Sequence, residues 1–138
     1  MAARRKTARG SATAPAPAPR APLAVLDAAA ILGASDIRVE ALDVPEWGGR
    51  VYIRTWSAAD REAFETAVVD AGGKLSAGRF RATVCQLSVA DAGGNLLFTP
   101  EQIPDLARRS AAAIQRVFQA ADKLNTVTAA AQDDLQGN

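Results

Sequence analysis

Two runs of alternating apolar and polar residues, 37–44 and 51–56, flank the short segment 45–49. Alternation with a period of two is typical of a strand that buries one face. Pro45 cannot donate a ladder hydrogen bond, and the two glycines that close the segment adopt the positive φ of a tight turn without strain. The pattern therefore predicts an antiparallel hairpin with a connection of about five residues.

A helix start follows the second strand directly. The Ser57 hydroxyl can accept a hydrogen bond from an early helical amide, and Asp60 places negative charge near the positive end of the helix. We expect this helix to run over residues 58–71 and to end at the two glycines that follow. Its inner face is predicted to consist of Ala63, Phe64, Ala67 and Val68.

The C-terminal part of the chain carries the clearest helix signals. Thr99 can cap a helix whose first residue is Pro100, and Pro104 should shorten or restart that helix. Ser110 can cap the next helix, and Asn125 can end it. This helix has one apolar stripe at helical spacing, formed by Ile114, Val117, Phe118, Ala121 and Leu124.

Three further segments complete the pattern. Residues 23–35 are spaced for one or two helical turns that stop at Gly33, and residues 128–135 for a short last helix. Residues 80–89 alternate in both phases, so their β-branched content favours a strand while a helix stays open. The sequence predicts an α+β domain, dominated by helix, in which a small β-hairpin or small antiparallel sheet packs with four to five helices.

Composition separates the first 22 residues from the rest of the 138-residue chain. They carry five basic residues, no acidic residue and four of the seven prolines. So little apolar surface cannot offset the entropy of ordering, which predicts a disordered basic arm over residues 1–22. The predicted folded domain, residues 23–138, has eleven basic and fifteen acidic side chains, a net charge of −4. Nucleic acid is not favoured as a partner, because the domain lacks a basic face with interleaved aromatics.

The residue inventory excludes several kinds of catalytic and metal site. The chain has no histidine and one cysteine, which rules out an internal disulfide, a His/Cys zinc site and a histidine-dependent triad. Cys85 lies in an apolar stretch and is predicted to be a buried, inert thiol. No phosphate-binding loop and no membrane-length apolar run occurs. We expect a cytoplasmic protein with no enzymatic activity, no cofactor and no membrane partner.

Several motifs together resemble one protein family. Residues 44–61 contain Pro-Glu-Trp-Gly-Gly, Val-Tyr-Ile-Arg and Ser-Ala-Ala-Asp-Arg, and residues 90–99 lead from a glycine-containing turn into Leu-Phe-Thr. Residues 121–128 contain a Leu-Asn motif. The combination is similar to the tail assembly chaperones of long-tailed bacteriophages over roughly residues 24–138. Trp47, inside Pro-Glu-Trp-Gly-Gly, is its most specific part.

The resemblance implies an assembly role in the bacterial host cytoplasm. Such chaperones bind the tape-measure protein and keep it soluble before the major tail (tube) protein polymerises around it, and they are absent from the mature virion. The role needs an apolar groove for an amphipathic helix, and self-association or repeated weak contacts along the tape. The family often makes two products by ribosomal frameshifting, and the ending Gln136-Gly137-Asn138 permits a slippery codon sequence.

Four aromatic residues are the candidate partner-binding residues: Trp47, Tyr52, Trp56 and Phe118. Tryptophan is enriched at binding hot spots, and Tyr52 and Trp56 are predicted to share one face of the hairpin. A structural role stays open for them, with Trp47 pinning the turn and Phe118 in the core. The alternative function is a structural minor tail or connector protein that is retained in the virion.

Overall fold

The computed structural model describes residues 22–69 and 72–127. The chain divides between Ala34 and Ser35 into two compact units. The predicted basic arm, apart from its last residue, and the predicted helix over 128–135 lie outside the described residues. The first unit contains the short helix α1 (Ala28–Leu32), which ends at Gly33 as predicted.

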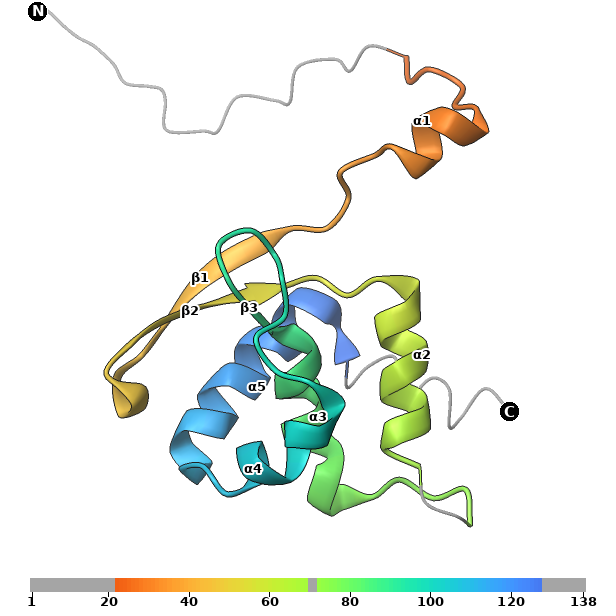
Figure 1. The fold of residues 1–138 in the computed structure, drawn as a ribbon. Helices are drawn as coiled ribbons and strands as arrows, with labels where there is room; N and C mark the ends of the chain where they lie inside the picture. Colours follow the sequence, from red (N-terminus) through yellow and green to blue (C-terminus); the bar gives the residue numbers. More distant parts are fainter. Residues whose placement is uncertain (1–21, 70–71, 128–138) are drawn as a thin grey trace, which may run out of the picture. The chain divides into compact units, whose positions relative to one another are not determined.

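The second unit begins with the predicted hairpin (Figure 1). β1 (Val39–Val44) and β2 (Gly49–Arg54) pair antiparallel, and the 3₁₀ turn η2 (Pro45–Trp47) joins them. Gly48 completes the turn at a φ of 74°, a left-handed conformation that glycine adopts without strain. A short third strand, β3 (Val89–Ala90), pairs antiparallel with β2 and gives the order β1-β2-β3. The hairpin is thus part of a small antiparallel sheet.

The buried face of the hairpin is set by the second half of β1. Leu42 lies opposite Val51 in the register, and Val44, at the end of the strand, is fully buried. Ile53 continues this face on β2 and is also buried, whereas Ala41 is exposed. The apolar alternation of residues 37–41 therefore changes phase at Leu42, where the strand begins to cover the core.

The helix α2 (Ala58–Ala67) begins with the predicted capping box. The Ser57 hydroxyl accepts from the Asp60 amide at 3.1 Å, and the Asp60 carboxylate accepts from the Ser57 amide at 3.0 Å. Of the predicted inner face, Phe64 and Val68 are buried, while Ala63 is exposed. The cap therefore fixes both the start of the helix and the direction in which Phe64 points.

The predicted end of this helix at residue 71 is wrong. The last helical residue is Ala67, and the Val68 carbonyl accepts a hydrogen bond from the Ser76 amide at 2.5 Å. Val69 forms an isolated antiparallel bridge with Leu75. The chain turns back before it reaches the glycines because these backbone pairings compete with another turn of helix.

The strand favoured for residues 80–89 is also wrong, since Ala77–Ser88 form the helix α3. Every residue from Ala82 to Ser88 is buried, and α3 contacts α2, α4 and α5. Because α3 has neighbours on several sides, it needs apolar residues on several faces. Its sequence therefore shows apolar residues at both odd and even positions although it forms no strand. Burial thus overrides the β-branched preference of this segment, and only Val89–Ala90 become a strand.

The segment after β3 starts its helix where predicted. The 3₁₀ turn η3 (Pro100–Gln102) opens with a capping box, in which the Thr99 amide donates to Gln102 Oε1 at 2.9 Å. The chain then restarts as the short helix α4 (Ile103–Ala107), with Pro104 in its first turn. Proline here lacks only an amide that needs no helical partner, so the break costs little.

The last described helix, α5 (Ala111–Asn125), is capped by Ser110, whose hydroxyl accepts from the Ala113 amide at 3.3 Å. The predicted stripe lies on its inner side. Four of its members are buried and Leu124 packs against them: Ile114, Val117, Phe118 and Ala121. The stripe and its end at Asn125 are confirmed.

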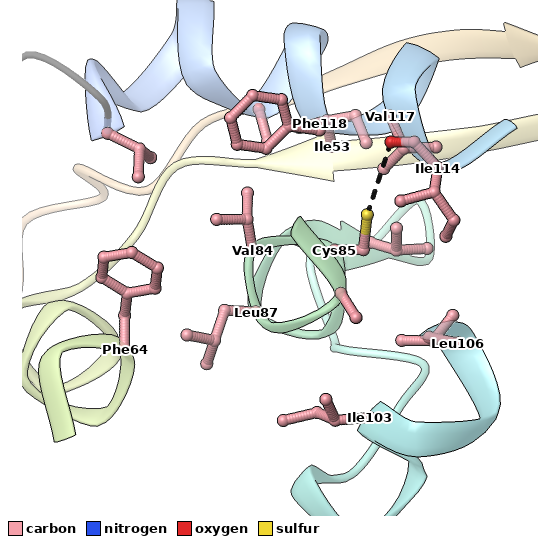
Figure 2. Close-up of a cluster of buried hydrophobic side chains, with 14 of the residues drawn as sticks. Ile53, Phe64, Val84, Cys85, Leu87, Ile103, Leu106, Ile114, Val117 and Phe118 are labelled. Atoms are coloured by element: carbon pink, nitrogen blue, oxygen red, sulfur yellow. Dashed lines mark hydrogen bonds between the residues drawn. The ribbon is translucent and has the colours of Figure 1, made fainter. Parts of the chain in front are cut away.

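The helix α3 forms the centre of the core, and side chains from α2, α4, α5 and β2 surround it (Figure 2). A chain of ring contacts links Trp56 to Phe64 at 5.1 Å, Phe64 to Phe80 at 5.2 Å, and Phe80 to Phe118 at 5.9 Å between centroids. Such tilted and edge-on contacts add to the burial of each ring. Within the described ranges, no helix has the length and apolar content needed to cross a membrane.

The junction between β2 and α2 connects the sheet to the helices. Arg54 Nη2 donates to Asp60 Oδ2 at 2.5 Å, and Arg54 Nη1 donates to the Gly94 carbonyl at 3.0 Å. The Arg54 and Asp60 side chains are 19% and 13% exposed, whereas those of the Arg50–Asp43 pair are 61% and 69% exposed. The first pair is therefore the better shielded from solvent and the more consequential for stability.

Asn125 brings the end of α5 to the same junction. Its Oδ1 accepts from the Trp56 amide at 2.8 Å, and its Nδ2 donates to the Arg54 carbonyl at 3.3 Å. The Asn125 carbonyl accepts from Arg61 Nη2 at 3.3 Å. The Trp56 indole N–H donates to the Ser88 hydroxyl of α3 at 2.9 Å. One short segment of chain thus holds β2, α2, α3 and α5 together.

Replacement of Asn125 tests this junction. We expect Asn125→Ala to lower the free energy of unfolding by about 1–3 kcal/mol, because it leaves the part-buried Trp56 amide without its acceptor. Urea denaturation followed by circular dichroism measures the change. The control is Gln119→Ala, at an exposed position of the same helix, which should stay within about 0.5 kcal/mol of the parent. Equal effects of the two substitutions would contradict the role given to Asn125.

Candidate functional site

An apolar hollow lies beside the hairpin turn. It has a volume of about 270 Å³ and is lined by Trp47, Phe98, Gln102, Asp105, Leu106 and Arg109. We call this hollow the Trp47 pocket. Its walls come from three parts of the sequence: the turn η2, the segment before η3, and the region from η3 to the loop after α4. An apolar hollow with a few polar groups at its edge is suited to receive an apolar side chain.

The turn that carries Trp47 is held against α5 by an ion pair. Arg116 Nε donates to Glu46 Oε1 at 3.0 Å, and Arg116 Nη2 donates to Glu46 Oε2 at 2.9 Å. Hydrogen bonding from the Arg116 guanidinium holds the pKa of the Glu46 carboxyl below its usual value. A two-bond contact of this kind fixes orientation as well as distance. Trp47, directly after Glu46, is half-buried and packs partly against the core.

The opposite wall of the pocket is set by α4. Leu106 is 3% exposed and anchors this short helix in the core, as its position in Figure 2 also shows. Phe98 is half-buried, and a hydrogen bond fixes its backbone: its carbonyl accepts from Gln86 Nε2 of α3 at 3.0 Å. Gln86 is buried, so this hydrogen bond also satisfies a polar group inside the core. The pocket is therefore built on anchored side chains.

A second hollow lies next to the Trp47 pocket and shares Arg109 with it. Its volume is about 580 Å³, and small residues of α3, α4 and α5 form much of its wall: Ala82, Ala107, Ala111 and Ala112. Arg81 lines its edge and donates through Nε to Gln115 Oε1 at 2.8 Å. The two hollows together provide an apolar surface that has Arg81, Arg109 and Asp105 among its lining residues.

The four predicted partner-binding residues do not form one surface. Trp47 lines the pocket that carries its name. Tyr52 is half-buried on β2, where it pairs with Ala41 and Ala90, and its neighbour Ile53 faces the core. The parity of the strand therefore places Tyr52 on the other face of the sheet.

The other two predicted residues are tied into the core. Trp56 lies beyond the end of β2, with its indole N–H bonded to Ser88, and the Arg61 guanidinium stands 5.1 Å from its ring centroid. Phe118 is 9% exposed, and the Arg81 guanidinium lies 5.2 Å from its ring. Both rings belong to the aromatic chain through α2 and α3. Partner binding by Tyr52, Trp56 and Phe118 stays a prediction.

Sequence reasoning missed five lining residues of the pocket: Phe98, Gln102, Asp105, Leu106 and Arg109. Phe98 belongs to the Leu-Phe-Thr motif, so a signal existed for it. Leu106 follows Ile103 at helical spacing, which marks it as buried but not as a pocket wall. Arg109 carries no sequence signal, because only the tertiary fold brings it between the two hollows.

Two titratable groups, Cys85 and Asp91, make hydrogen bonds within the unit. The Cys85 thiol is buried, donates to the Ile114 carbonyl at 3.8 Å (Figure 2), and has its pKa raised by burial to about 12. Asp91 accepts from the Gly93 and Asn95 amides, both at 2.9 Å, and these bonds hold its pKa below the usual value. Nowhere in the described residues do three or more His, Cys, Asp or Glu side chains gather as metal ligands.

The fold has a counterpart among solved structures. It is similar to the structure of the bacteriophage HK97 tail assembly chaperone, with a TM-score of 0.50 and 18% sequence identity. The match covers 70% of this chain and 94% of the other. At this identity the likeness shows a common fold, which agrees with the fold implied by the sequence motifs. No protein-family model and no curated protein sequence matches the chain.

Burial of Cys85 predicts a pH-dependent stability. Because the folded pKa of about 12 exceeds the ordinary 9.0, the unfolded chain loses the thiol proton first, and stability falls as the pH rises between these values. We expect this group to contribute a loss of about 1.4 kcal/mol per pH unit in that window. Urea denaturation of the parent and of Cys85→Ala measures the difference. If the free energy of unfolding had the same pH dependence in both proteins, burial would not raise the pKa of the thiol.

Proposed function

We propose that the protein is a phage tail assembly chaperone that binds and solubilises the tape-measure protein during tail morphogenesis, without catalysis. The observation that carries the proposal is the fold shared with the HK97 chaperone over 94% of that chain. The Trp47 pocket adds physical support, because a helix-binding protein needs accessible apolar surface on a firm scaffold.

The geometry of the two hollows suits an amphipathic helix. A pocket of about 270 Å³ takes a large apolar side chain, and the adjoining hollow offers a place for residues one or two turns further along. Arg109 borders both hollows and can pair with a carboxylate on such a helix. Asp105 also lines the first hollow, so the favoured ligand is an apolar helical face whose flanking polar residues can include either charge.

A single contact of this size is weak, which fits the proposed task. The tape-measure protein is long, so many copies of the chaperone can bind along it at once. Weak individual contacts let the major tail (tube) protein displace the copies one after another as the tube grows. We propose that this occurs in the cytoplasm of the bacterial host and that the mature virion does not retain the protein.

Co-expression with the tape-measure protein tests the proposal. We expect the tape-measure protein to become soluble and to co-purify with this chain. Trp47→Ala should weaken the interaction about 30-fold, as expected for the loss of a hot-spot tryptophan. Val69→Ala is a matched control, because it truncates an apolar side chain that is 40% exposed and does not line either hollow.

The composition of purified tails separates this proposal from its alternative. A chaperone should be missing from finished particles, whereas a structural minor tail or connector protein would be retained in them. An insoluble tape-measure protein in the co-expression, together with this chain in purified tails, would overturn the chaperone assignment.

A further inference from the structure

The tip of the hairpin has little apolar burial of its own. None of the three described residues of η2 is buried, whereas Val44, directly before the turn, is fully buried. The Gly48 amide donates to the Pro45 carbonyl at 3.0 Å and closes the turn on itself. Apolar packing therefore fixes the base of the turn, and the tip depends on the contacts of Glu46 and Trp47.

Trp47 is the part of this tip that forms the pocket. Among the described lining residues it alone comes from the hairpin, and the other five lie between residues 98 and 109. Leu106, on the opposite wall, is 3% exposed and fixed in the core. A movement of the turn would displace one wall only, so the pocket keeps its form only while Trp47 stays in place.

We propose that Glu46 and Arg116 are positioning residues of the Trp47 pocket, and that they make its affinity for an apolar ligand depend on ionic strength. Neither residue lines either hollow described above, so any effect on a ligand bound there passes through Trp47. Their two hydrogen bonds join the tip to α5 across 70 positions of the sequence. The Arg116 side chain is 45% exposed and that of Glu46 is 23% exposed, so dissolved salt weakens the ion pair.

The ion pair gives the turn two states, one with the pair closed and one with it open. Because only the closed turn completes the pocket, the open fraction of molecules lowers the apparent affinity for a ligand. A bound ligand favours the closed state in return. An apolar contact alone does not weaken in salt, so a loss of affinity at high salt would come from the pair. The role of the pair rests on the proposed function only in that the pocket binds a ligand.

Quenching of Trp47 fluorescence by acrylamide measures the position of the turn without a ligand. In a Trp56→Phe background Trp47 is the only tryptophan. We expect quenching to increase between about 0.01 and 1 M NaCl, as the Debye length falls from about 30 Å to about 3 Å. Glu46→Arg should show the increase already at low salt, because two like charges then face each other. The exchanged variant Glu46→Arg/Arg116→Glu should return to the value of the parent.

Binding of the neutral apolar dye N-phenyl-naphthylamine tests the pocket itself. We expect its dissociation constant to rise about threefold over the same salt range, which is within the contribution of a partly exposed ion pair. Glu46→Arg should weaken the dye at low salt, and the exchanged variant should restore it. Trp47→Ala should bind the dye more weakly at every salt concentration. Circular dichroism checks folding, and Arg116→Gln is a second variant in case Glu46→Arg unfolds.

A second ion pair in the same hairpin provides a matched control. Arg50 Nε donates to Asp43 Oδ1 at 2.7 Å, and this bond joins β1 to β2 without reaching α5. Asp43→Arg creates the same contact of like charges as Glu46→Arg does. It should change neither the quenching of Trp47 nor the affinity for the dye, because the link between the turn and α5 stays intact.

Three results would each overturn the role of the pair: equal quenching of Trp47 in Glu46→Arg and the parent, an exchanged variant that does not recover, and a dye affinity that is independent of salt. A parent protein that does not bind the dye would also overturn it, because the pocket would then not be a binding site for apolar ligands. The chaperone assignment is judged separately, by co-expression with the tape-measure protein.

Discussion

The fold depends on the junction between β2 and α2, where the Arg54–Asp60 ion pair meets the side chain of Asn125. The third strand has only two residues, so the sheet is little more than a hairpin, which is marginally stable alone and needs packing against the helices. The junction does this through backbone and side-chain hydrogen bonds to α3 and α5. The polar groups of the junction orient the sheet and the helices, and apolar packing supplies the stability of these elements.

The position of the sheet then decides what the surface can do. The strands leave the junction and carry the turn η2 to the far end of the hairpin, where the Glu46–Arg116 pair fixes it on α5. Trp47 is thereby brought beside Leu106 of α4, and the pocket is the space that remains between them. A hairpin anchored at both ends presents its tryptophan at a defined place, which limits the entropy lost when a partner binds.

Local rules were sufficient for much of this fold. The hairpin, the capping boxes at Ser57 and Thr99 and the stripe on α5 each follow from a few neighbouring residues. The helix α3 could not be predicted in this way, because its apolar residues pack against helices that are distant in sequence. The same reason explains the site: Trp47 was found through its motif, whereas Arg109 joins it only through the tertiary fold.

Fluorescence of Trp47 during binding tests the central claim, that this pocket receives the helix of the tape-measure protein. The chain has two tryptophans, so Trp56→Phe leaves Trp47 as the only reporter and Trp47→Phe leaves Trp56. A helical segment of the tape-measure protein titrated into each variant should shift the emission of Trp47 to shorter wavelength, saturably, and leave that of Trp56 unchanged. Binding that leaves the Trp47 emission unaltered would place the partner elsewhere and contradict the account.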